Sequence, residues 1–150
     1  MKYYYTLFLG LLLTSCQLHD ENSETAVDVA AKEWAEAYFN FDYEKALEYM
    51  TPESGQWIRF AASNISEEDI SFIKEHEVET KIYITDRQMS ESDSLCQTRI
   101  RVSDFIQLGM DPEESRVIDE ADFLIQLVKR NDKWLVKTEG LPQSEMQSLD

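Results

Sequence analysis

The spacing of hydrophobic residues in this chain changes once, near residue 76. That change limits the possible fold classes more than any other feature of the sequence. Before it, apolar residues recur every three or four positions, the spacing of one helical face. After it, they alternate with polar residues, the spacing of a half-buried strand. A run of helices followed by a run of strands is typical of α+β domains, in which helices pack on one face of an antiparallel sheet.

Helical spacing predicts a first helix over residues 26–41, directly followed by Asp42, which is suited to cap a second, shorter helix. A third short helix is expected at residues 57–61, and Ser66 with Asp69 matches the capping-box pattern that opens a fourth helical turn. The side of the first helix that should face a core consists of Val27, Ala30, Ala31, Trp34, Ala37, Tyr38 and Phe41.

Alternation of apolar and polar residues predicts a sheet of about four strands in the second half of the chain. The strands are expected at residues 78–84, 96–102, 121–127 and 133–137. Asn131 and Asp132 both tolerate positive φ and so suit a tight turn between the last two strands. Short connections favour an antiparallel sheet with one buried face, on which Cys96 is expected to be a buried, inert thiol.

Composition excludes several classes of function. The 14 Lys and Arg residues face 30 Asp and Glu residues, a formal net charge of −16, whereas nucleic-acid binding depends on the opposite excess. The 4 Gly residues lie too far apart for a phosphate-binding loop, and the 2 His residues have no clustered partners at metal-ligand spacing. We therefore expect one domain without nucleic-acid binding, cofactor or metal in these 150 residues.

The N-terminus has the pattern of a cleaved export signal. Lys2 supplies a positive charge, and residues 3–13 form an apolar stretch shorter than the roughly 20 residues that span a bilayer. The stretch ends in Leu-Thr-Ser-Cys, residues 13–16, which resembles the lipobox of bacterial lipoproteins. In that family a signal peptidase cuts before the Cys, whose sulfur carries a diacylglycerol. The resemblance implies a signal peptide at residues 1–15 and acyl chains such as palmitate on Cys16; an ordinary secretory signal with an incidental Cys is the alternative.

The segment after the predicted lipid is polar and has no hydrophobic period. We expect a flexible tether at residues 16–25, a folded domain at residues 26–141 and a tail at residues 142–150. The lipid would hold this domain in the cell envelope, on the outer membrane of a Gram-negative bacterium. Asp20 and Glu21 resemble a surface-export signal of lipoproteins, whereas a solvated linker would suit a periplasm-facing protein, and both locations stay open.

Three segments carry a known pattern of packing and turns. They are residues 34–39 in the first helix, residues 41–49 with the run Asp-Tyr-Glu-Lys-Ala, and residues 131–136 in the last hairpin. Their order resembles the nuclear transport factor 2-like superfamily, a cone of helices on a strongly curved antiparallel sheet, and in particular its small bacterial lipoproteins. The resemblance covers about residues 26–140 and implies an α+β cone; many of these lipoproteins have no assigned function.

We expect a non-catalytic domain that binds a small molecule or a protein partner. The candidate pocket residues are Trp34, Tyr38, Tyr49, Trp57 and Asp104. The aromatic residues among them are also suited to fill the core under a curved sheet, which is the commoner role. Enzymes of the resembling superfamily pair a carboxylate base with a hydrogen-bond donor in the cone, so an isomerase- or cyclase-like enzyme would use Asp104 as base and Tyr38 as donor.

A third hypothesis is an interaction module that pairs through the outer face of the sheet. That face would carry Leu124, Val128 and Leu135, with Arg99 and Arg101 among them. A dry apolar patch would favour a protein partner or a homodimer, whereas the arginines make the face mixed and favour a weak or polar contact.

Overall fold

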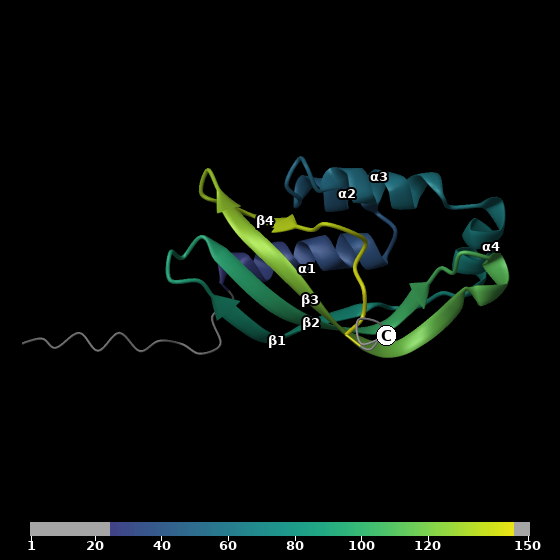
Figure 1. The fold of residues 1–150 in the computed structure, drawn as a ribbon. Helices are drawn as coiled ribbons and strands as arrows, with labels where there is room; N and C mark the ends of the chain where they lie inside the picture. The colour runs from purple at the N-terminus through teal and green to yellow at the C-terminus, as the bar shows by residue number, and fades with distance from the viewer. Residues whose placement is uncertain (1–24, 146–150) are drawn as a thin grey trace, which may run out of the picture.

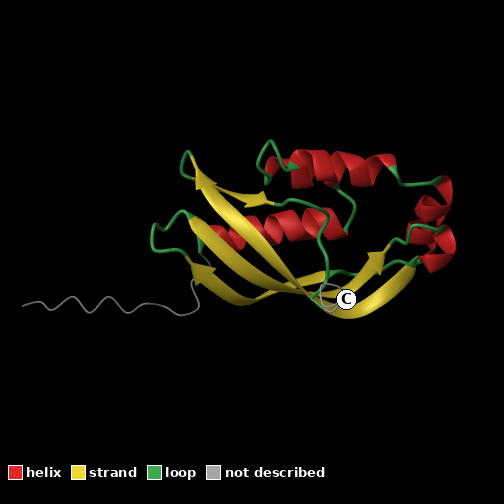
Figure 2. Ribbon diagram, viewed as in Figure 1, coloured by secondary structure: helices red, strands yellow, loops and turns green. Residues whose placement is uncertain are grey.

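The computed structural model describes residues 25–145, and within this range four helices precede four strands. The helices are α1 (Ala26–Phe39), α2 (Tyr43–Glu48), α3 (Gly55–Ser63) and α4 (Glu67–Glu75). The strands are β1 (Lys81–Met89), β2 (Leu95–Gln107), β3 (Arg116–Arg130) and β4 (Lys133–Lys137), with a 3₁₀ turn, η1 (Pro112–Glu114), before β3. The strands form one antiparallel sheet in the order β1-β2-β3-β4, which curves around the helices (Figure 1, Figure 2). This confirms the predicted α+β fold.

Several predicted features lie outside the described residues: the signal peptide at residues 1–15, Cys16, the tether up to residue 24, and residues 146–150 of the tail. The described part of that tail returns to the sheet. Ser144 pairs with Phe123, and the Glu145 N–H donates to the Asp122 carbonyl at 2.9 Å. Within residues 25–145, none of the helices is both long enough and apolar enough to cross a membrane.

α1 runs along the concave face of the sheet and supplies much of the core (Figure 1). A capping box starts it: the Thr25 hydroxyl accepts from the Asp28 N–H, and the Asp28 carboxylate accepts from the Thr25 N–H, both at 3.3 Å. An ion pair from Asp28 to Arg87 ties this first turn to β1. The helix ends at Phe39, earlier than predicted, because Phe41 has a left-handed backbone (φ 62°) that a helix cannot continue. Phe39 therefore takes the core position expected for Phe41.

Cap residues start two of the other helices as predicted. Asp42 caps α2 by accepting from the Lys45 N–H at 3.2 Å. Ser66 and Asp69 form the expected capping box of α4, with the Asp69 N–H donating to the Ser66 hydroxyl at 3.1 Å. The third helix, α3, is longer than the predicted residues 57–61 and turns Ile58 into the core.

The sheet keeps the predicted alternation over most of its length. The inward residues of β2 are fully buried, and they are Cys96, Thr98, Ile100 and Val102. Asn131 and Asp132 form the tight turn between β3 and β4 with φ of 51° and 61°. β1 begins at Lys81 rather than at residue 78, because Lys81 pairs with Ser103, the last residue of β2 before the strand becomes irregular.

The irregularity lies in the β2–β3 hairpin, directly after Ser103. On β2, the residues that face the core are even-numbered up to Val102, and the next one along the chain is Phe105. On β3, they are odd-numbered back to Ala121, and the next one toward the N-terminus is Ile118. Both strands thus shift their inward face by one residue at the same place. On β2 the shift occurs at Asp104, which has a left-handed φ of 53°. Beyond this level the hairpin bends toward α4 (Figure 2).

Candidate functional site

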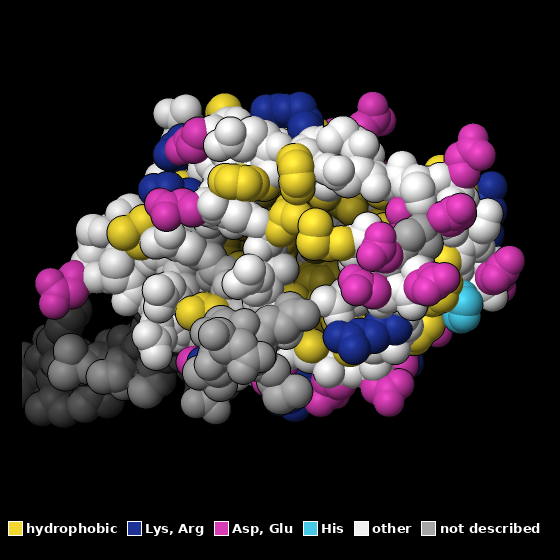
Figure 3. All heavy atoms as spheres, turned by 45° about the vertical axis from the view of Figure 1, so that its right-hand side comes forward, with side chains coloured by type: hydrophobic (Ala, Val, Ile, Leu, Met, Phe, Trp, Pro, Cys, Tyr) yellow, Lys and Arg dark blue, Asp and Glu magenta, His cyan; other side chains and the backbone are white. Residues whose placement is uncertain are grey.

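A cavity of about 780 Å³ lies at the open end of the cone. Its walls come from the end of α1 with the start of α2, the α3–α4 connection, the bent end of the β2–β3 hairpin, and residues 141–145. Figure 3 shows a hollow with apolar side chains around and inside it and charged groups near its rim. Ligand pockets in proteins commonly have volumes of about 300–1,000 Å³, so this cavity has the size to hold a small molecule.

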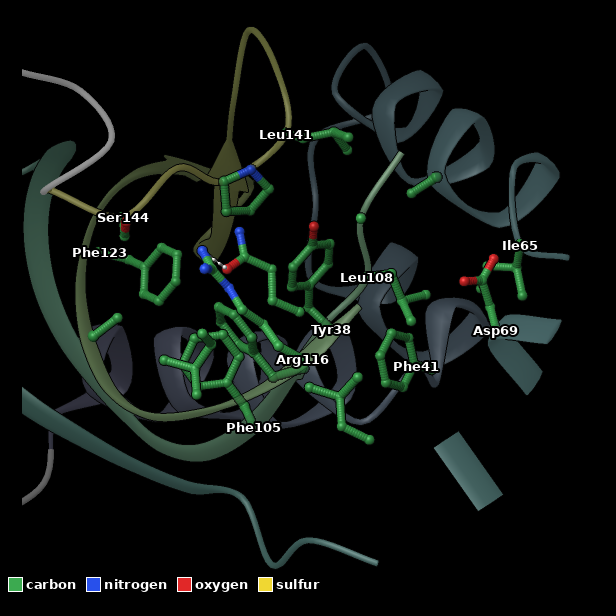
Figure 4. Close-up of a pocket in the computed structure, with 18 of the residues that line it drawn as sticks. Tyr38, Phe41, Ile65, Asp69, Phe105, Leu108, Arg116, Phe123, Leu141 and Ser144 are labelled. Atoms are coloured by element: carbon green, nitrogen blue, oxygen red, sulfur yellow. Dashed lines mark hydrogen bonds between the residues drawn. The ribbon is translucent and has the colours of Figure 1, made fainter. Parts of the chain in front are cut away.

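Three phenylalanines form the inner wall of the cavity. Phe39 of α1 lies 5.2 Å from Phe105 of β2 and 4.9 Å from Phe123 of β3, measured between ring centroids, and Phe105 lies 5.8 Å from Phe123. Their rings meet edge-on or tilted, the preferred arrangement of aromatic pairs. Leu108 and Leu141 add aliphatic side chains to the lining (Figure 4). The cavity is therefore apolar over most of its inner surface.

Two tyrosines bring hydroxyl groups to this apolar wall. Tyr38 comes from the last turn of α1 and Tyr43 is the first residue of α2, and their ring centroids lie 5.8 Å apart. Burial raises the pKa of Tyr38 well above its ordinary value and that of Tyr43 to about 12, so both hydroxyls stay protonated at neutral pH. Within residues 25–145, neither hydroxyl is hydrogen-bonded, and both are free to donate to a bound molecule.

A basic residue points into the cavity from β3. Arg116 pairs with Gln107 across the hairpin, two residues beyond Phe105 and Ile118, and so both side chains lie on the concave face. The Arg116 guanidinium donates to the Gln107 side-chain oxygen at 3.4 Å (Figure 4). Of the described residues that line the cavity, Arg116 is the one Lys or Arg, and no described carboxylate lies within 4.0 Å of its guanidinium.

Every carboxylate along the cavity wall is held by another group of the protein. These residues are Asp69, Glu120, Asp122 and Glu145. The Asp69 carboxylate accepts from the Ser66 N–H and hydroxyl, both at 2.8 Å. Arg101 donates to the two oxygens of Asp122 at 2.8 and 3.0 Å, which lowers the pKa of that carboxyl, and lies 3.5 Å from Glu120. Arg99 donates to Glu145 at 3.0 Å.

The structure brings one of the five predicted pocket residues, Tyr38, to the cavity. Trp34 stacks on Tyr38 at 5.3 Å but is only 1% exposed and belongs to the core. Tyr49 lies at the C-cap of α2 with the Lys133 ammonium 5.8 Å from its ring centroid. Trp57 is half-buried on α3 and does not line the cavity.

Asp104, the fifth predicted residue, lies outside the cavity wall and is exposed. Strict alternation along β2 would place it inward, but the left-handed backbone at this residue moves the inward position to Phe105. Its carbonyl accepts a hydrogen bond from the Thr80 hydroxyl at 3.0 Å, which joins the bend to the start of β1. The arrangement needed for an Asp104 base beside a Tyr38 donor is therefore not present in this structure.

The outer face of the sheet is mixed, as predicted. Leu124 is 50% exposed, but Val128 is only 7% exposed and Leu135 is half-buried. Arg99 lies opposite Leu124 and pairs with Asp86 at 3.4 Å. Charged groups therefore interrupt the apolar residues on this face.

Arg116 and Gln107 were not among the residues selected from the sequence. The predicted strands covered residues 96–102 and 121–127, so residues 107 and 116 belonged to neither of them. A usable signal was the hairpin register itself: continuing the pairing of Val102 with Ala121 across the turn pairs residue 107 with residue 116. The shift at Asp104 places Arg116 and Gln107 on the inward face. The pattern of apolar residues gives no sign of this shift.

No metal site is found among the described residues, since none of their His, Cys, Asp and Glu side chains form a group of three at ligand distance. His76 lies at the C-cap of α4, where its ring stacks on Phe72 at 4.0 Å and its Nδ1 lies 2.9 Å from the Phe72 carbonyl. Cys96 is buried in β2, as predicted.

No protein-family model and no curated protein matches this sequence. Among solved structures, the chain is similar to an NTF-2-like protein of unknown function from Shewanella oneidensis, with a TM-score of 0.51 and 14% identity over 79% of this chain and 95% of that one. A structure from Catenulispora acidiphila gives a TM-score of 0.48 and 14% identity over 83% of this chain and 92% of that one. The first similarity supports the NTF-2-like fold.

Proposed function

We propose that this protein binds a small, mainly apolar molecule in the cavity of the cone, while a lipid on Cys16 holds it at an envelope membrane. The observation that carries the first part is a cavity of about 780 Å³ walled by Phe39, Phe105 and Phe123. A cavity of this size with mainly apolar walls is typical of small-molecule sites.

Binding is favoured over catalysis by the state of the polar groups along the wall. A general base must be free to take a proton from a bound molecule. The four lining carboxylates are each hydrogen-bonded to a serine or an arginine of the protein. Among the described lining residues, the hydroxyls of Tyr38 and Tyr43 make no hydrogen bond and the guanidinium of Arg116 makes one, to Gln107, so these donors can bind a ligand oxygen.

Two neighbouring alanines of α3 allow a matched test of the site. Ala61 lines the cavity, while Ala62 is exposed on the same helix and does not. The full chain carrying Cys16→Ser, which removes the predicted lipid, would be titrated with the neutral apolar dye Nile red. We expect saturable binding at one site, weakened at least about tenfold by Ala61→Phe, which fills the mouth, and unchanged by Ala62→Phe. Equal binding by both variants, or no saturable binding, would contradict the proposal.

The lipid anchor rests on the sequence of residues 13–16 and has its own test. Cells would be grown with labelled palmitate, and the protein would be followed in membrane and soluble fractions. The unmodified chain should carry the label and sediment with membranes, whereas Cys16→Ser should lose the label and leave the membrane. Cys96→Ser is the matched control and should behave like the unmodified chain, since this thiol is buried.

A further inference from the structure

We propose that the ligand is an apolar molecule with a single carboxylate and that Arg116 binds this carboxylate, with the Tyr38 hydroxyl as a second donor. The inference rests on the proposed function of the cavity and names the class of molecule that it takes.

Arg116 has no ionic partner among residues 25–145. The chain has a formal charge of −16, so a basic side chain has many carboxylates available to it. Arg99 and Arg101 of β2 are both ion-paired, to Glu145 and to Asp122 respectively. The Arg116 guanidinium has one hydrogen bond, the long contact to Gln107 at 3.4 Å, and most of its N–H groups are unused by the described residues.

The position of Arg116 on the β2–β3 hairpin places its side chain at the cavity. Because it follows the shift in both strands, its side chain shares the concave face with Phe105 and Ile118 instead of the outer face, where arginines pair with carboxylates. In Figure 4 the Arg116 and Tyr38 side chains both reach into the hollow beside the rings of Phe105 and Phe123. A molecule with an apolar body on these rings would place a terminal group at the guanidinium.

A ligand in the cavity meets carboxylates that are already held by other groups. Asp122 and Glu120 are held by Arg101, and Asp69 is held in the cap of α4. None of them is free to neutralise Arg116 or to attract a cationic ligand. A planar carboxylate can accept two N–H groups of a guanidinium at once, and such charge-assisted bonds are about twice as strong as neutral ones. The cavity therefore favours an anion over an alcohol, and an alcohol over a cation.

Three probes with one apolar body and different head groups test this order. Dodecanoate, dodecanol and dodecyltrimethylammonium would each displace Nile red from the Cys16→Ser chain at neutral pH, below the concentrations at which they form micelles. We expect dodecanoate to displace the dye at about one tenth of the dodecanol concentration, the ratio for one charge-assisted contact at a partly exposed site. Dodecyltrimethylammonium should require more than dodecanol.

Arg116→Gln should reduce the preference for dodecanoate over dodecanol to about one, and Tyr38→Phe should reduce it by about threefold. Arg130→Gln is the control: it removes the same charge from a residue that pairs with Glu53 away from the cavity, and it should keep the preference. Equal binding of dodecanoate and dodecanol, or a preference that survives Arg116→Gln, would overturn the inference while leaving the cavity a binding site. Failure of all three probes and of the dye would overturn the proposed function itself.

Discussion

A buried hydroxyl should contribute more to the stability of this cone than any exposed polar residue of its helices. Ser54 precedes α3 but does not cap it. Its hydroxyl instead lies 2.7 Å from the Thr51 hydroxyl, donates to the Thr138 carbonyl at 3.1 Å and accepts from the Thr138 N–H at 3.0 Å. Ser54 and Thr51 are both fully buried. This small network joins the start of α3 to the chain that leaves β4 toward the cavity.

The cost of removing this hydroxyl follows from the groups that it leaves behind. Ser54→Ala deletes three hydrogen bonds and leaves the Thr51 hydroxyl and both backbone groups of Thr138 without this partner. Each bond contributes about 1 kcal/mol, and buried groups left unsatisfied raise the cost. We therefore expect Ser54→Ala to lower the free energy of unfolding by about 3 kcal/mol.

Urea unfolding followed by tryptophan fluorescence measures this change. Ser63→Ala is the control, because the Ser63 hydroxyl makes one exposed bond, to the Phe60 carbonyl at 2.8 Å, and its loss should cost less than about 0.5 kcal/mol. If Ser54→Ala costs less than about 1 kcal/mol, the network does not hold α3 to β4 and the reasoning is refuted.

Asp132→Gly should raise the free energy of unfolding by about 0.5–1 kcal/mol, since this exposed turn residue has φ 61°; the midpoint of urea unfolding checks it. The Arg130 side chain donates to Glu53 and lowers the pKa of that carboxyl to about 2. A lowered pKa stabilises the fold above the ordinary value of 4.5, and the gain is lost as the pH falls toward 2, so Arg130→Gln should make the unfolding midpoint less sensitive to pH in that range. Asp104→Asn should leave Nile red binding unchanged. A large loss of dye affinity would mean that this carboxylate takes part in binding.

Local chemistry explains which parts of the fold could be predicted. Asp42, Ser66 and the Asn131–Asp132 turn act through bonds and φ values within a few residues, and each is found as expected. The buried face of β2 follows from simple alternation up to Val102. The predicted end of α1 was wrong because Phe41 has a left-handed backbone, which the sequence pattern does not indicate at an aromatic residue.

The candidate site was less accessible to sequence reasoning than the fold. The aromatic residues on helix faces were selected as pocket candidates because they are large. Size alone does not distinguish Trp34, which fills the core, from Tyr38, which borders the cavity. Arg116 lies in a stretch of charged residues, where one arginine looks like any other solvated group. That no described residue forms an ion pair with it is a property of the folded hairpin, since the pairs of Arg99 and Arg101 depend on strand register.

The bend at Asp104 links the misplaced prediction to the site that the fold forms. Had β2 and β3 continued their alternation, Phe105 and Ile118 would face outward, and Arg116 would share the outer face with the ion pairs of Arg99 and Arg101. A shift by one residue in both strands exchanges these faces without breaking the register between them. Aspartate is among the residues that tolerate a left-handed backbone. The backbone of Asp104 can therefore shape the cavity although its side chain lies outside the cavity wall. The residue first considered as a base thus has a geometric role: its backbone lies where both strands exchange their inward and outward faces.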